Sequence, residues 1–239
     1  MTAALLALVL SATPPSLTLK YDLEVTGAAH TSVTLRAQGP RLRIDADSTH
    51  MTVVKDDARK VMTFTGPKPG VCYELPYAKL PEFQVLAIRR YQKSQSAYFE
   101  SLSPPDRLAW RSHFDKAVSD VRNAKPRVQT LTWLKSEKLE RPCELYQVTE
   151  AGADVGTICL QVTGAAPKSL TLTASPGEWW QGANVYLAQG FVPVQYEQKR
   201  NGVVQSRASL VSLDRAAFPA SVFVLGKHCE SGLALDEGR

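Results

Sequence analysis

The chain has 239 residues, of which 44% are hydrophobic and 21% charged. This apolar content is too high for an intrinsically disordered chain, and the 14 glycines follow no collagen-like three-residue repeat. The net charge of +5 is spread along the sequence and is not gathered on one element with interleaved aromatic residues, so it does not indicate nucleic-acid binding.

The first fifteen residues are typical of a secretory signal peptide. Residues 3–10 form an apolar run, and Thr13-Pro14-Pro15 ends the segment. A run of this length is too short to span a bilayer, which takes about 20 residues. Residue 13 is Thr where a lipoprotein signal requires Cys. We therefore predict a soluble product, periplasmic or secreted, that is not membrane-spanning; the alternative is a retained, buried N-terminal segment.

Residues 16–75 are predicted to form an antiparallel meander. Apolar and polar residues alternate along residues 17–25, as in a strand with one buried face. Similar short runs recur at a spacing of about ten residues, with turn signals such as Gly39-Pro40 and Asp56-Asp57 between them. Strands are expected at residues 17–25, 33–37, 42–46, 51–55, 60–65 and 70–75.

The hydrophobic period then changes to that of helices. Residues 82–102 place their apolar side chains on one helical face. A second helix is predicted after Ser103, because serine is a favourable N-cap and Pro104 and Pro105 suit a first helical turn. Lys125-Pro126 is expected to end it. Residues 82–125 therefore form a helical insert between two sets of strands.

Strands resume after this insert. They are expected at residues 128–134, 143–149, 155–163, 169–173, 191–199, 203–213 and 220–225, with Asn201-Gly202 as the clearest hairpin turn. A capping box at residues 175–178 opens a short helix that carries Trp179 and Trp180. The polar tail at 230–239 is expected to be loose. We predict one domain over residues 16–229, with about eleven strands and three helices.

Four cysteines are present, at positions 72, 143, 159 and 229, without metal-ligand spacing. An even number in an exported chain predicts two disulfides. If the hairpin between 143 and 163 folds about Ala151, Cys143 lies directly opposite Cys159, close to the separation that a disulfide needs. Cys72 then pairs with Cys229. The alternative is four buried free thiols.

No motif in the sequence supports catalysis. The four histidines lie far apart, and there is no GxSxG, no phosphate-binding glycine loop and no cysteine with an assigned base. Asp45 and Asp47 share a strand face, and Asp56-Asp57 is more typical of a solvated turn. We predict that the protein is not an enzyme and holds no metal or other cofactor.

Bulky aromatic residues are the candidates for a ligand pocket. Trp110 and Phe114 belong to the apolar stripe of the second helix, and ordinary helix packing is the alternative interpretation. Adjacent helical residues point about 100° apart, so Trp179 and Trp180 cannot both face the core. The candidate pocket residues are Trp110, Phe114, Trp133, Trp179 and Trp180.

Several segments occur in an order shared with a known bacterial superfamily. They are the opening strand at 17–25, the run at 40–45, Tyr73-Glu74-Leu75-Pro76 before the helices, the run at 189–194 and the run at 218–225. In order and spacing they resemble the LolA/LolB-like periplasmic lipoprotein carriers, and more closely an exported family of unknown function with that fold. The resemblance implies a curved antiparallel sheet forming an incomplete barrel, with helices packed in its concave face.

The resemblance also implies a function. In this superfold the space between sheet and helices can hold acyl chains. We therefore predict a soluble periplasmic binding or carrier protein whose partner is a lipid, a lipoprotein acyl chain or another apolar ligand. The alternative is an envelope sensor or protein-interaction module without a bound ligand. The resemblance supplies no catalytic residue.

Overall fold

The computed structural model describes residues 16–47, 50–66, 70–124, 127–162, 165–174, 186–187 and 189–233. The predicted signal peptide lies outside these ranges, as do Trp179 and Trp180 with most of the short helix expected around them.

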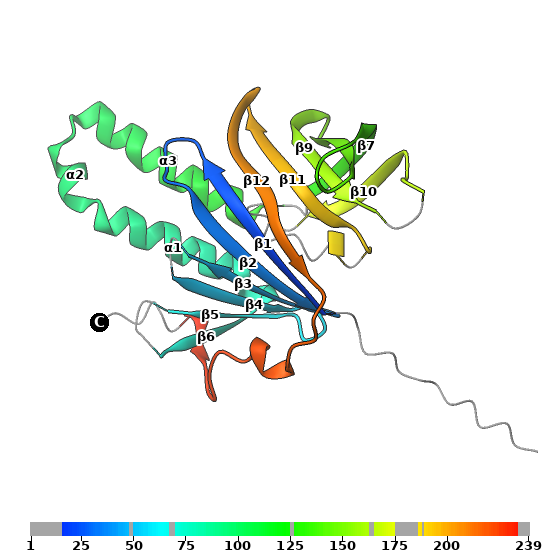
Figure 1. The fold of residues 1–239 in the computed structure, drawn as a ribbon. Coiled ribbons are helices and arrows are strands. Elements are labelled where there is room, and N and C mark those ends of the chain that lie inside the picture. Colours follow the sequence, from blue (N-terminus) through cyan, green and yellow to red (C-terminus); the bar gives the residue numbers. More distant parts are fainter. Residues whose placement is uncertain are drawn as a thin grey trace, which may run out of the picture.

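The described strands form one sheet that does not close on itself (Figure 1). Its strands are β1 (Ser16–Val25), β2 (Thr31–Gln38), β3 (Arg41–Ala46), β4 (Met51–Asp56), β5 (Val61–Thr65), β6 (Cys72–Pro76), β7 (Arg127–Glu137), β8 (Cys143–Glu150), β9 (Ala153–Gln161), β10 (Ser169–Ala174), β11 (Val192–Arg200), β12 (Val203–Asp214) and β13 (Glu230–Ser231). They lie in the order β10-β7-β8-β9-β11-β12-β1-β2-β3-β4-β5-β6-β13. The predicted mainly β fold with an incomplete barrel is confirmed.

One face of this sheet forms the core. In β1, Leu19, Tyr21 and Leu23 are buried, while the residues between them are exposed. The buried cluster continues through both halves of the sheet, because β12 pairs with β1 and joins the N-terminal meander to the second set of strands. The Tyr21 hydroxyl donates a hydrogen bond to the Pro193 carbonyl, 2.7 Å away, inside this core.

The hairpin β8–β9 carries a disulfide between Cys143 and Cys159, with the Cα atoms 5.5 Å apart. The predicted pairing is confirmed, but the predicted direct opposition is wrong, since Leu145 is the partner of Cys159 in the ladder. The register shifts beside Val155, which leaves one extra residue in β9. Gly156 follows at φ +147°, where the Glu197 backbone of β11 approaches too closely for a side chain.

After β12, which lies in the middle of the sheet, the chain crosses β3 and reaches β6, the last strand of the meander. A strand is predicted over residues 220–225, but residues 220–223 form the 3-10 helix η3 (Ala220–Phe223) and the chain continues without regular structure through residue 225. This segment lies against β3, and both edges of β3 are already occupied by β2 and β4, so no backbone ladder is open to it. The guanidinium of Arg41 lies 4.7 Å from the Phe223 ring centroid, and Arg43 Nη1 donates to the Val222 carbonyl at 2.8 Å.

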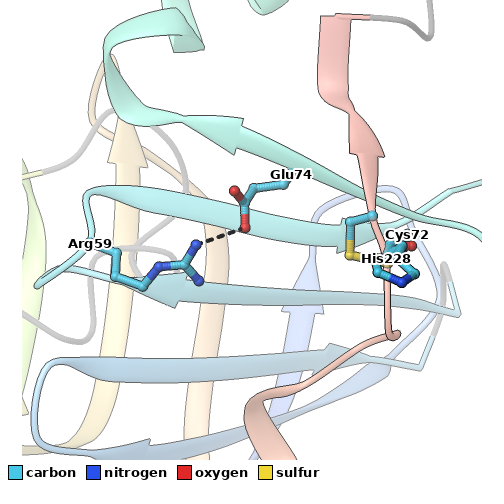
Figure 2. The surroundings of a disulfide bond; sticks show 5 residues. Arg59, Cys72, Glu74 and His228 are labelled. Atoms are coloured by element: carbon cyan, nitrogen blue, oxygen red, sulfur yellow. Dashed lines mark hydrogen bonds and ion pairs between the residues drawn. A yellow bond between two sulfur atoms is a disulfide. The ribbon is translucent and has the colours of Figure 1, made fainter.

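The returning chain ends beside β6. Glu230 and Ser231 form β13, which pairs with β6 in parallel, so the prediction of a loose tail from residue 230 is wrong for these two residues. The predicted disulfide between Cys72 and Cys229 is confirmed, and Figure 2 shows it next to β13. Further along β6, Glu74 forms an ion pair with Arg59 at 3.3 Å. The C-terminal segment is therefore covalently tied to the edge of the meander.

The helical insert lies between β6 and β7. It begins with the 3-10 turn η1 (Tyr77–Lys79) and continues through α1 (Leu80–Ser94), α2 (Ser96–Ser101) and α3 (Pro104–Arg122). The single helix predicted over residues 82–102 is interrupted at Gln95, between two serines of modest helix propensity. Figure 1 shows α1 and α3 as an antiparallel hairpin with α2 at the end away from the sheet. Among the described residues, no helix is both long and apolar enough to cross a membrane.

Candidate ligand-binding site

Local sequence signals define the two long helices of the hairpin. Pro81 lies in the first turn of α1. Ser103 caps α3: its hydroxyl oxygen accepts a hydrogen bond from the backbone N–H of Asp106, and Pro104 and Pro105 occupy the first positions of the helix. These signals set the register that brings the aromatic residues of the hairpin together.

Aromatic rings form a continuous row along the hairpin, from α1 through α3 to α2. The ring centroids of Trp110 and Phe114, one helical turn apart on α3, are separated by 4.5 Å. Phe99 of α2 lies 4.9 Å from Trp110, and Tyr91 of α1 lies 6.0 Å from Phe114. The two candidate pocket residues on α3 are thus neighbours, and they join residues from both other helices.

Among the described residues of the hairpin, only those near its base pack against the core of the sheet. Leu80 and Phe83 of α1 pack against the core, and the Phe83 ring lies 5.5 Å from that of Phe64. Beyond Phe83, the aliphatic residues Val85, Leu86 and Ile88 are half-buried. No residue of α1 is buried, and α3 buries only Phe114 and Val118.

Trp133 has a different environment, at the sheet and away from the aromatic row. Its indole N–H donates to a carboxylate oxygen of Glu144 at 2.7 Å, and the Ser136 hydroxyl donates to the same oxygen at 2.8 Å. The Lys168 ammonium lies 3.6 Å from the Trp133 ring centroid. The two hydrogen bonds, helped by the Lys168 charge, lower the pKa of Glu144. Trp133 is therefore held by polar partners while its ring also packs against the core.

Lysines that the sequence pattern did not single out lie close to aromatic rings. Lys168 is one of them, and Lys55 is another. Lys55 is only 9% exposed, and it pairs across the sheet with the core residue Leu42. Its ammonium nitrogen lies 6.0 Å from the Tyr77 ring centroid. Burial lowers the pKa of Lys55, although the nearby Asp57 charge opposes this shift. No spacing rule along the chain would have identified either contact.

Two hollows of the described surface have mixed polar and apolar linings. One, of about 310 Å³, lies over β8, β9, β11 and β12 and is lined by residues such as Gln195, Glu197 and Arg207. The other, of about 260 Å³, includes Glu24, His30 and Arg207. Both hollows mix polar with apolar side chains, Leu145 and Tyr196 among them in the larger one, and differ from the mostly apolar pocket that is typical of ligand sites. Within the described ranges, no three His, Cys, Asp or Glu side chains gather as metal ligands.

Comparisons with known proteins show a likeness to solved structures but not to any family model or curated sequence. No protein-family model matches the sequence, and no curated protein matches it. The chain is similar to the crystal structure of a LolA superfamily protein from Nitrosomonas europaea, with 8% sequence identity and a TM-score of 0.34. The match covers 88% of this chain and 90% of that one. An identity of 8% is too low to transfer a ligand or an activity between the two chains.

Proposed function

We propose that this chain is an exported binding and carrier protein for a lipid, a lipoprotein acyl chain or another apolar ligand that lies against the helical hairpin. The observation that carries the proposal is the incomplete burial of the apolar side chains of the hairpin. Fifteen residues of α1 include none that is buried, although the helix contains Val85, Leu86 and Ile88.

Isolated helices of this length are marginally stable in water unless they bury an apolar face. The hairpin buries Phe114 and Val118 and anchors Phe83 on the core, whereas Val85, Leu86 and Ile88 of α1 stay partly exposed to water. An apolar ligand placed against α1 would remove that surface from water, which is worth about 25 cal/mol per Å². This gain favours a binding role for the hairpin.

The disulfides support the exported part of the proposal. Cys72–Cys229 and Cys143–Cys159 account for all four cysteines, and stable disulfides are typical of oxidising compartments. This agrees with the secretory signal peptide predicted for the first fifteen residues.

Native mass spectrometry with lipid extraction tests the proposal. The protein is purified from the envelope fraction of cells that express the full sequence, and the expected result is a reproducible bound mass that extraction identifies as lipid. Protein that is reproducibly bare would overturn the carrier function and would make the interaction module the better interpretation.

A pair of variants locates the ligand. Ile88→Asp places a charge at a half-buried position of α1, whereas Ala87→Asp makes the same change at the exposed neighbouring position. Burying a carboxylate against an acyl chain is strongly unfavourable, so we expect Ile88→Asp to lose bound lipid and Ala87→Asp to keep it. Equal lipid occupancy in both variants would place the ligand elsewhere.

A further inference from the structure

The far end of the helical hairpin exposes large apolar side chains. This hairpin tip comprises residues 90–111, which are the last turn of α1, all of α2 and the first two turns of α3. Leu108 is 72% exposed, Tyr91 61% and Tyr98 56%. Each of the three helices contributes one of them, so the exposure belongs to the tip as a whole. Such side chains gain free energy by moving from water into an apolar or interfacial environment.

Basic side chains occur in the same hairpin tip as these apolar residues. The hairpin tip contains four basic residues against two acidic ones. The guanidiniums of Arg111 and Arg107 lie 4.9 and 5.6 Å from the Phe99 ring centroid. Arg107 also donates to the carbonyl oxygens of Leu102 and Glu100 at 2.9 and 2.6 Å. In the described structure these two arginines are therefore held by rings and carbonyls, which leaves their positive charge uncompensated by a carboxylate.

We propose that the hairpin tip docks on the surface of a membrane that contains anionic phospholipid. Guanidinium and ammonium groups attract and bind phosphate headgroups, while tyrosine and leucine side chains enter the interface beneath them. Figure 1 shows α2 at the end of the hairpin away from the sheet, so a flat surface can reach the tip before it meets the strands. The proposal goes beyond the carrier function and does not require a ligand against α1.

Co-sedimentation with lipid vesicles tests this docking. The purified protein is mixed with vesicles of phosphatidylcholine alone or of phosphatidylcholine with phosphatidylglycerol. We expect binding to the anionic vesicles that weakens as salt is raised, because salt screens the attraction between exposed charges. Failure of the protein to bind the anionic vesicles would overturn the proposal.

Two variants of the hairpin tip separate the contribution of its charge to vesicle binding from that of its apolar surface. Lys93→Gln/Arg111→Gln removes two cations and is expected to weaken binding by more than about tenfold, since each cation near an anionic surface contributes about fivefold. Leu108→Ser removes the most exposed apolar side chain and is expected to weaken binding by about tenfold. Arg107 is left unchanged because its hydrogen bonds hold the turn between α2 and α3.

Matched control variants test whether losing the same charge or exposed apolar surface elsewhere on the molecule also weakens vesicle binding. Lys135→Gln/Lys138→Gln makes the same change in net charge around the end of β7, and Val211→Ser removes a 57% exposed side chain from β12. We expect both controls to bind like the unchanged protein and all variants to unfold at the same temperature. Equal loss in tip and control variants would overturn the docking site. A lipid-free protein that still docks through the tip would refute only the carrier function.

Discussion

At the scale of single residues, Asp45 is the most heavily bonded acid in the described sheet. Both carboxylate oxygens accept from Arg43, at 2.8 to 3.0 Å, and Oδ2 also lies 2.5 Å from Arg36 Nη1. Thr52 donates to Oδ1 at 2.7 Å. Burial alone would raise the pKa of Asp45, but the hydrogen bonds from Arg43 and Thr52 and the two arginine charges lower it overall. The residue is thus a structural anion, and Arg43 extends its network to the Val222 carbonyl of the returning chain.

Asp45→Asn is expected to destabilise the protein by about 2 kcal/mol at neutral pH, because two partly buried arginines lose their shared anion. The pKa of Asp45 is lower in the folded than in the unfolded chain, so its contribution is complete above the unfolded value of about 4. That contribution disappears as the pH falls through the folded value. Urea unfolding of both proteins at pH 7 and at about pH 3 measures their free energies of unfolding. The difference in this free energy between the variant and the unchanged protein should be smaller at the lower pH.

The exposed ion pair of Asp120 with Lys116 provides the control for this experiment. Asp120→Asn removes the same charge from the surface of α3, where such a pair contributes only about 0.5 kcal/mol. A stability gap for Asp45→Asn that stays constant between the two pH values would contradict the assigned role of the carboxylate.

At the scale of elements, the sequence predicts the first half of the sheet best. Strands β1 to β6 neighbour one another in chain order, so alternation and turns are sufficient to define them. The pairing of β12 with β1 joins residues nearly two hundred positions apart and leaves no local signal. Residues 220–225 have a strand-like composition, but they lie against β3, whose two edges already pair with β2 and β4. They therefore add no strand to the sheet. In β9 the extra residue beside Gly156 changes the register, and alternation does not reveal it.

In the candidate site, as in the sheet, the sequence predicts contacts between residues close along the chain but not those that depend on the tertiary fold. Trp110 and Phe114 are four residues apart, and a helix places them together. Phe99 contacts Trp110 because the helix is interrupted at Gln95 and α2 turns toward α3. The sequence predicts a continuous helix over these residues and therefore does not predict this contact. Lys168 meets Trp133 only because β10 pairs with β7, so that contact is a consequence of the tertiary fold.

Phe83 is expected to control how firmly the hairpin is held. Phe83→Ala removes the ring that packs on Phe64 at the base of α1 and should cost about 2 kcal/mol, since the side chain is only half-buried. Hydrogen exchange should become faster in α1 and α3 while the central strands keep their protection. Gln84→Ala, at the next position of the helix, is the control. Uniform acceleration throughout the sheet would show that the hairpin and sheet unfold as one unit.

At the scale of the whole molecule, the two disulfides constrain very different lengths of chain. Cys143–Cys159 closes a hairpin across 16 residues, whereas Cys72–Cys229 spans 157 and encloses the helical hairpin and most of the second set of strands. Gly226 packs against the Cys72 sulfur, and β13 is only two residues long. The return of the C-terminal segment to β6 therefore depends on its covalent bond more than on its backbone ladder.

The two bonds should accordingly differ in their effect on stability. In the chain-entropy description, a disulfide stabilises by restricting the unfolded chain, by about 3 kcal/mol for a loop of the shorter length and about 5 kcal/mol for the longer one. Cys72→Ser/Cys229→Ser should therefore lower the free energy of unfolding by about 2 kcal/mol more than Cys143→Ser/Cys159→Ser. Urea unfolding of the two double variants measures this difference. An equal or larger loss in the hairpin variant would mean that contacts within the folded protein, rather than loop length, decide what each bond contributes.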